Sequence, residues 1–186
     1  MYQLDALFNW RNNMNIKPTL LKTILATMVL SNPVLAFESN VKLRVAVVKN
    51  ATGTHEIVKG EFDSGIRKLN RLRKDEDSFG SNMGLCVAYL QTKEAEQSES
   101  ACTAAINSAK KINLRSSKAD YLKSLSYNNR GISRYINNDV SGALSDLNAA
   151  VLIDDNTITT SNLELLKQYS FKQGSIASTT SSVLSD

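Results

Sequence analysis

The stretch NRGISRYINNDVSGALSDLNAAVLIDD, residues 129–155, decides the fold of this chain. Apolar residues recur at helical spacing on both sides of a polar centre, which is the pattern of two amphipathic helices. The centre, Asn137-Asn138-Asp139, predicts the turn between them. Gly131 in the first helix and Ala143 in the second are small enough to let two antiparallel helices cross closely. The stretch therefore predicts a helical hairpin.

The same residues resemble the tetratricopeptide (TPR) repeat, a helical hairpin of about 34 residues. The repeat has a glycine in its first helix, an alanine twelve residues on, a large apolar residue four later and an alanine three beyond that. These places are held here by Gly131, Ala143, Leu147 and Ala150. Tyr127 stands where the repeat has an aromatic residue.

The match has three departures. Arg130 takes the place of a leucine, Arg134 that of a tyrosine, and Asp155 that of the terminal proline. Tyr135 is expected to do the work of the missing aromatic residue.

Two weaker copies precede this hairpin. The middle copy places Leu85, Cys86, Tyr89, Ser98, Cys102, Ala105 and Ile106 at the same offsets, with its turn near Lys93-Glu94-Ala95. The first copy aligns Gly53, Gly60, Glu61, Phe62, Gly65, Ile66 and Leu69. The copies lie 33 residues apart from Gly53 to Cys86 and 45 from Cys86 to Gly131, so residues 107–119 are expected to hold an inserted connection.

The last hairpin needs a lid, because its apolar face is otherwise exposed. Thr159-Thr160-Ser161-Asn162 before an apolar run predicts an N-capped helix that covers it. The predicted fold is thus all-α: antiparallel hairpins stacked as a short TPR-like solenoid, with a C-terminal capping helix, over residues 46–170. Residues 37–45 are expected to form a lead-in segment before the repeats, and residues 171–186 are expected to form a disordered Ser/Thr-rich tail. The alternation in 41–47 fits a strand or the start of a helix.

The N-terminal region has the order of a secretory signal peptide. Met14 opens a segment with two lysines, residues 23–30 are an apolar run, Pro33 breaks it, and small residues lead to Ala36. Cleavage is expected between Ala36 and Phe37, with the signal proper at 14–36 and residues 1–13 an over-extended start. The run is shorter than the about 20 apolar residues of a membrane span. The product is expected in the periplasm or secreted, with no membrane span.

Cys86 and Cys102 are the only cysteines. They lie at nearly equal distances from the turn of the middle hairpin, so the two helices can bring them face to face. In an oxidising compartment such a pair forms a disulfide. The alternative is two buried free cysteines that pack as small apolar residues.

Composition and motifs argue against catalysis and against nucleic acid. The 22 basic and 18 acidic residues give a net charge of +4, and the basic cluster at 71–74 runs directly into Asp75-Glu76-Asp77. His55 is the single histidine, so metal sites and triads that need several are excluded. No phosphate-binding glycine loop or nucleophile elbow is present. No enzyme activity, cofactor or metal is predicted.

In TPR proteins the first helix of each hairpin lines a concave groove. The resemblance therefore implies a groove that binds an unidentified protein or peptide partner, with Asn128 fixing the backbone of an extended or helical peptide. Its expected lining is Met83, Val87, Leu90 and Gln91 from the middle copy and Asn128, Ile132, Tyr135 and Ile136 from the last. The alternative, equally weighted for Val87 and Ile132, is that these residues only pack one repeat on the next. The function predicted is a non-catalytic binding module of the cell envelope. The alternative is a self-associating periplasmic scaffold.

Overall fold

The computed structural model describes residues 7–9, 43–72, 78–112 and 117–183, with side chains from residue 43 to residue 171 within these ranges. Nearly all of the regular structure there is helical, so the predicted all-α class is confirmed. The predicted signal peptide and its cleavage site, and most of the lead-in, lie outside the described residues. Within those ranges, no helix combines the length and the apolarity that a membrane crossing requires.

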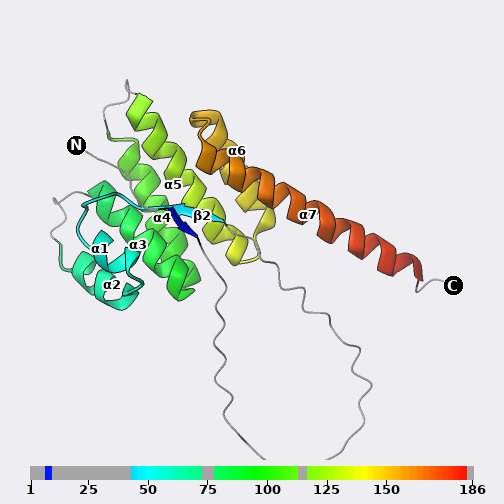
Figure 1. The fold of residues 1–186 in the computed structure, drawn as a ribbon, viewed down its shortest axis with the longest axis horizontal. Helices are drawn as coiled ribbons and strands as arrows, with labels where there is room; N and C mark the ends of the chain where they lie inside the picture. Colours follow the sequence, from blue (N-terminus) through cyan, green and yellow to red (C-terminus); the bar gives the residue numbers. More distant parts are fainter. Residues whose placement is uncertain (1–6, 10–42, 73–77, 113–116, 184–186) are drawn as a thin grey trace, which may run out of the picture.

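Two helical hairpins form the centre of the fold (Figure 1). The first joins α3 (Ser78–Thr92) to α4 (Ala95–Ala109), and the second joins α5 (Ser117–Ile136) to α6 (Val140–Ile153). Both turns lie where the sequence predicts them. Each contains a residue in the left-handed region, Lys93 at φ 62° and Asn138 at φ 65°. Asp139 caps α6, because its Oδ1 accepts the N–H of Gly142 at 2.8 Å.

The crossing of α5 and α6 depends on Gly131. A Cβ at this position would lie 3.0 Å from Cγ of Leu147 and 3.1 Å from the carbonyl oxygen of Ala143. Any side chain here would push the two helices apart, which is the role that the glycine has in the sequence pattern. Helix α4 ends at Ala109 and α5 begins at Ser117, so the two hairpins are joined inside the range predicted for the insertion.

The N-terminal hairpin is reduced. Its first helix, α1 (Thr54–Val58), has only five residues, and α2 (Phe62–Asn70) has nine. Left-handed glycines lie on both sides of α1, Gly53 at φ 79° and Gly60 at φ 81°, and limit its length. Lys68 of α2 pairs with Glu56 of α1 at 2.9 Å, and this hydrogen bond is the main reason that the pKa of Glu56 is lowered.

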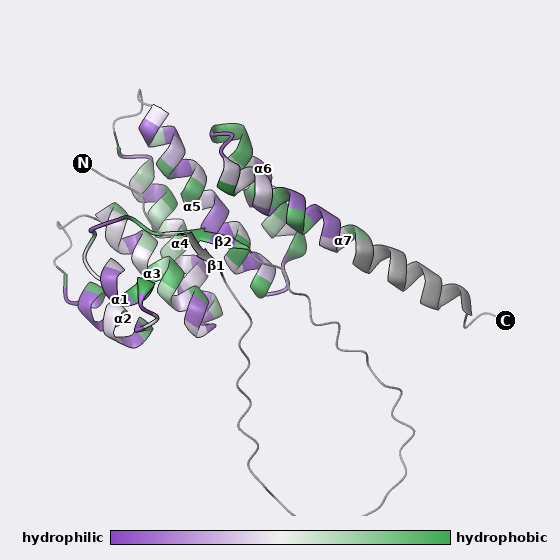
Figure 2. Cartoon of the chain, in the orientation of Figure 1, coloured by the Kyte–Doolittle hydropathy of each residue, from purple (hydrophilic) through white to green (hydrophobic). Residues whose placement is uncertain are grey.

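An extended segment, Leu43–Val48, lies among the helices and contains strand β2 (Arg44–Ala46). The alternative left open by the sequence is thereby resolved as a strand. All its residues except Arg44 are buried. Figure 2 shows this apolar strand in the middle of the molecule. Strand β1 (Leu7–Asn9) pairs with it in antiparallel register, with Phe8 opposite Val45.

Helix α7 (Thr157–Val183) packs against α5 and α6 and covers the last hairpin, as expected of a lid. Its start differs from the prediction: Oδ1 of Asn156 accepts the N–H groups of Ile158 and Thr159, so the cap precedes residues 159–162. The end differs too, because the helix continues to Val183 where a disordered tail is expected from residue 171. Both prolines of the chain lie before residue 34, so none interrupts the helix. The end of α7 projects beyond the hairpins (Figure 1).

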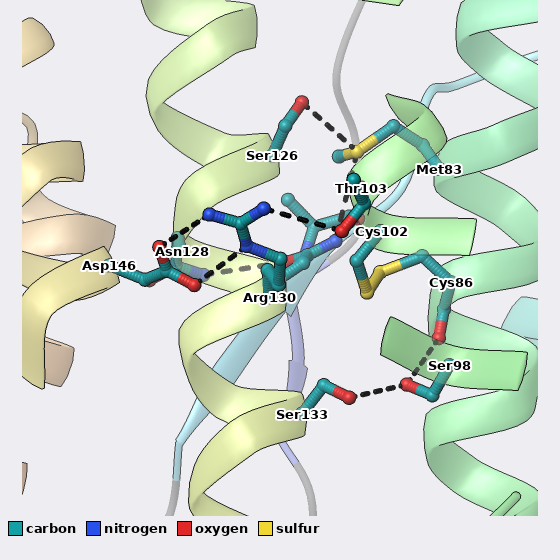
Figure 3. The surroundings of a disulfide bond; sticks show 12 residues. Met83, Cys86, Ser98, Cys102, Thr103, Ser126, Asn128, Arg130, Ser133 and Asp146 are labelled. Carbon is teal, nitrogen blue, oxygen red and sulfur yellow. Dashed lines mark hydrogen bonds and ion pairs between the residues drawn. A yellow bond between two sulfur atoms is a disulfide. The ribbon is translucent and has the colours of Figure 1, made fainter. Parts of the chain in front are cut away.

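The two cysteines are joined across α3 and α4. The Cα atoms of Cys86 and Cys102 are 4.7 Å apart, within the range for a disulfide, and both residues are fully buried. Ser98 extends the contact to α5, because its hydroxyl lies 2.7 Å from that of Ser133 (Figure 3). The bond therefore fixes the α3–α4 hairpin at the level where it meets the second hairpin.

The bond is expected to stabilise the fold by constraining the unfolded chain. Its partners are separated by 16 residues, and closing a loop of that size contributes about 3 kcal/mol in the chain-entropy model. Replacing both cysteines by alanine should lower the free energy of unfolding in urea by about that amount. Ser100→Ala, on the exposed side of α4, is the control and should change it by less than about 0.5 kcal/mol. Two reactive thiols in unreduced, unfolded protein would contradict the bond.

Candidate functional site

A cluster of three buried asparagines holds the backbone of β2. Asn128 and Asn129 come from α5 and Asn162 from α7, and all three are fully buried. We refer to these residues as the asparagine cluster. A strand that lies among helices has no neighbouring strand on its inner side, so its peptide groups there need side-chain partners. The cluster supplies them.

Asn129 pairs with both peptide groups of Ala46. Its Oδ1 accepts the Ala46 N–H at 3.0 Å, and its Nδ2 donates to the Ala46 carbonyl at 2.7 Å. The primary amide of asparagine carries one acceptor and two donors, so it can replace the peptide group of a neighbouring strand. Two hydrogen bonds on one residue also fix the position of β2 along its own axis.

Asn162 makes the equivalent pair of bonds with Arg44. Its Oδ1 accepts the Arg44 N–H at 2.9 Å and its Nδ2 donates to the Arg44 carbonyl at 2.8 Å. Asn128 donates to the same carbonyl at 3.0 Å and accepts from Nδ2 of Asn162 at 2.7 Å. The cluster is therefore connected across α5 and α7 as well as to the strand, and each side chain is held in one orientation.

The side chains of the extended segment enter two apolar clusters. Leu43, Val45 and Val47 pack in one. Ala46 and Val48 pack in the other. Because successive residues of a strand point to opposite faces, the segment is covered on both sides and joins helices that would otherwise not meet. Both its backbone and its side chains are thus bound as a peptide ligand would be.

The predicted groove residues lie around this segment. Val87, Leu90 and Ile132 are buried in the cluster that contains Val45, and Tyr135 and Ile136 pack against it half-buried. Met83 belongs to the other cluster. Gln91 is half-buried and its Nε2 has no hydrogen-bond partner in the described part of the chain.

Asn128, predicted to fix the backbone of a partner, fixes the chain's own Arg44 instead. Asn129 and Asn162 were not predicted as binding residues. The consecutive pair Asn128-Asn129 in an otherwise apolar helical face is the signal in the sequence that could have indicated them, because buried amides require partners. The residues predicted to line a groove therefore pack around a segment of this chain.

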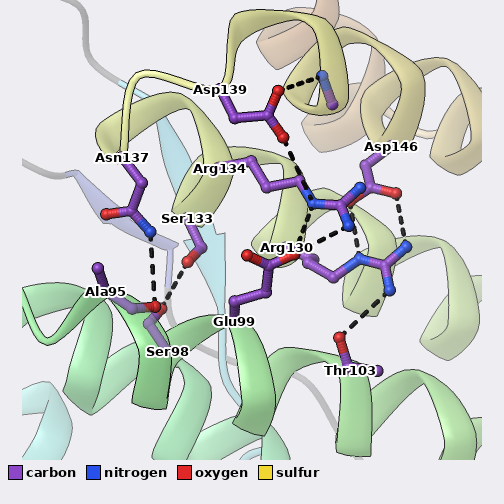
Figure 4. Close-up of polar contacts among 11 residues, drawn as sticks. Ala95, Ser98, Glu99, Thr103, Arg130, Ser133, Arg134, Asn137, Asp139 and Asp146 are labelled. Carbon is purple, nitrogen blue, oxygen red and sulfur yellow. Dashed lines mark hydrogen bonds and ion pairs between the residues drawn. The ribbon is translucent and has the colours of Figure 1, made fainter.

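The two arginines that depart from the TPR pattern converge on one carboxylate. Arg130 donates from Nε and Nη2 to the two oxygens of Asp146 at 2.8 and 2.7 Å. Arg134 reaches the same carboxylate at 3.0 Å and Glu99 of α4 at 2.9 Å (Figure 4). Asp146, on α6, has a side chain only 5% exposed. The hydrogen bond to Asp146 is the main reason that the pKa of Arg130 is raised. The network ties the two hairpins together.

Little in the described residues resembles a catalytic or metal site. No group of three or more His, Cys, Asp or Glu side chains lies close enough there to hold a metal ion. His55 is exposed on the short helix α1. An open depression between α3 and α4 is lined by residues such as Leu85, Tyr89 and Ala101, with Glu96 its single acidic residue. Among the described residues, we therefore take the asparagine cluster and the strand that it binds as the candidate functional site.

Replacing Asn129 by leucine should destabilise the fold and free one backbone site. The variant leaves the N–H and the carbonyl of Ala46 buried without partners, which we expect to cost about 3 kcal/mol in the free energy of unfolding. Amide hydrogen exchange should show a loss of protection at Ala46. Asn148→Ala removes an asparagine that bonds only within its own helix and is the control. Unchanged protection at Ala46 would contradict the role of the cluster.

Arg130→Met tests the buried ion pair. The variant leaves Asp146 with Arg134 as its remaining charged partner, so we expect a loss of about 2 kcal/mol, less than for a fully broken buried pair. The double variant Arg130→Met and Asp146→Leu should recover part of this loss in urea denaturation, because the buried carboxylate is removed and Arg134 keeps its pair with Glu99. Lys68→Met breaks an exposed pair and should cost about 0.5 kcal/mol at most. Additive losses in the double variant would refute this coupling.

Comparison with known protein families, with curated proteins and with solved structures finds no match to this chain. The resemblance to TPR proteins therefore rests on the residues of the pattern itself. Any inference about function must therefore be based on the asparagine cluster, the disulfide and the strand that lies between the helices.

Proposed function

We propose that the chain is a non-catalytic module of the cell envelope that binds an extended segment of another protein. The observation that carries this proposal is that the asparagine cluster forms hydrogen bonds with the backbone of the extended segment Leu43–Val48. Side-chain amides from α5 and α7 form hydrogen bonds with four peptide groups of an extended segment. Helical hairpins that fix an extended backbone in this way have the chemistry that peptide recognition needs.

The disulfide supports the envelope as the compartment. Disulfides persist in oxidising compartments and are rare in the cytosol of mesophiles. Cys86 and Cys102 are bonded at a fully buried position. Together with the signal-like order of residues 14–36, the bond favours a periplasmic or secreted protein over a cytosolic one.

The margin of the groove is the surface that we assign to the partner. Gln91, Tyr135 and Ile136 remain half-buried at the edge of the occupied groove. Tyr169 of α7 is half-buried beside them in the same apolar cluster. Aromatic and aliphatic side chains at a partly exposed rim are typical of protein-binding surfaces. The deeper residues, Val87 and Ile132, serve to hold the chain's own strand.

The alternative function is a self-associating scaffold, and one observation favours it. Two large apolar side chains are strongly exposed, Leu152 of α6 at 87% and Phe171 of α7 at 80%. Apolar surface of this kind marks contacts with other chains where it gathers into a patch. A second copy of the chain would then cover the α6–α7 side.

Site-specific photocrosslinking in living cells tests the proposal. Tyr135 is replaced by p-benzoylphenylalanine in the tagged full chain, and the cells are irradiated. We expect one adduct of defined mass that contains a different envelope protein, because the probe lies at the proposed rim. The adducts are identified by mass spectrometry.

The matched control places the same probe at Tyr121, which is also half-buried on α5 but packs against a different apolar cluster near the start of the helix. The adduct should be several-fold weaker there. An adduct of twice the chain's mass at Tyr135 would instead support the self-associating scaffold. Equal labelling at both positions would refute the rim as a binding surface.

A further inference from the structure

The two edges of β2 are paired in different ways. Peptide groups of successive strand residues point to opposite edges. Arg44 and Ala46 direct theirs inward, where Asn162 and Asn129 pair with them. The N–H and the carbonyl of Val45 therefore face the other edge, and β1 occupies that edge with Phe8 opposite Val45.

The strand on this edge comes from a part of the chain that export would remove. Residues 7–9 precede the predicted cleavage site between Ala36 and Phe37. A processed chain would keep β2, held from the inner side by the asparagine cluster, and would lose β1. The peptide groups of Val45, a residue with no exposed surface in the full chain, would then have no strand to pair with. An unpaired strand edge is a template for the addition of another strand.

We propose that the outer edge of β2 is a strand-addition site, which in the processed chain accepts an extended segment of a partner protein. The partner strand runs antiparallel to β2, in the register that Leu7–Asn9 now occupies. This inference rests on the export step of the proposed function and names the kind of partner. Main-chain hydrogen bonds to Val45 supply the affinity, as in other complexes formed by strand addition.

The faces of β2 define the side chains that the partner needs. A residue opposite Val45 shares its face, which is the apolar face that also carries Leu43 and Val47. The partner therefore has an apolar residue at this position. A residue opposite Arg44 lies beside a half-buried guanidinium that has no ion pair in the described part of the chain. An acidic residue fits there, because opposite charges stabilise a cross-strand pair.

The chain's own N-terminal segment supplies the probe for a binding assay. The peptide DALFNWRN, residues 5–12, contains Trp10, the single tryptophan of the chain. A chain processed after Ala36 keeps tyrosines but has no tryptophan, so selectively excited tryptophan fluorescence reports only the peptide. The full chain is expressed with its own signal, collected from the envelope and sequenced at its N-terminus. We expect a product that begins at Phe37 and binds the peptide saturably.

Two methylated peptides provide the matched control. In this register the N–H of Phe8 points toward β2 and that of Leu7 points away, because opposed residues alternate between bonded and non-bonded pairs. N-methylation at Phe8 should weaken binding by about tenfold, the effect of one main-chain hydrogen bond. N-methylation at Leu7 should change it by less than about twofold. An Asn9→Asp peptide should bind more tightly than an Asn9→Lys peptide.

Four results would overturn the proposal. They are a purified chain that retains Trp10, no saturable binding, equal weakening by the two methyl groups, and a stable dimer that the peptide does not dissociate. The dimer would mean that a second copy, and not another protein, occupies the edge. Photocrosslinking at Tyr135 does not depend on strand pairing, so the last three results can be distinguished from failure of the proposed function. Retention of Trp10 would count against the export step that both proposals share.

Discussion

The structure depends on the need to pair the peptide groups of a strand that lies among helices. A buried N–H or carbonyl without a partner costs about 1–3 kcal/mol, so an unsupported strand could not remain in this position. The asparagine cluster meets the need on the inner side. Strand β1 meets it on the outer side. The two sides differ in kind, since one is built into the helices and the other is a separate piece of chain.

The inner support also explains the arrangement of the helices around it. Asn129 and Asn162 must both reach β2, so α5 and α7 lie on the same side of the strand, and the contact between Asn162 and Asn128 joins them directly. The strand fills the space between α3 and α5 that a groove would otherwise leave open, with Val87 and Ile132 packed against it. The extended segment is therefore part of the core that connects the hairpins.

The sequence predicts the local parts of this fold and misses the long-range ones. The turns at Lys93 and Asn138, the close crossing at Gly131 and the cysteine pair follow from spacing within one hairpin. The asparagine cluster does not, because its partners lie 83 and 118 residues away along the chain and are peptide groups, which any residue carries. The arginines at 130 and 134 were visible only as departures from a pattern. Their common partner, Asp146, becomes apparent once α5 and α6 are packed.

Recognition through peptide groups has a consequence for the kind of partner that the proposed site selects. Amide side chains and strand edges form hydrogen bonds with the main chain of a partner, which is the same in every sequence. They therefore accept many sequences with similar affinity. Specificity must then come from the few side chains beside the edge, which are Val45 on the apolar face and Arg44, which has no ion pair among the described residues. The chain's own segment places the apolar residue Phe8 opposite Val45 and the neutral residue Asn9 opposite Arg44. A segment that satisfies both would compete with it, even where the concentration of the chain's own segment is raised by its covalent link.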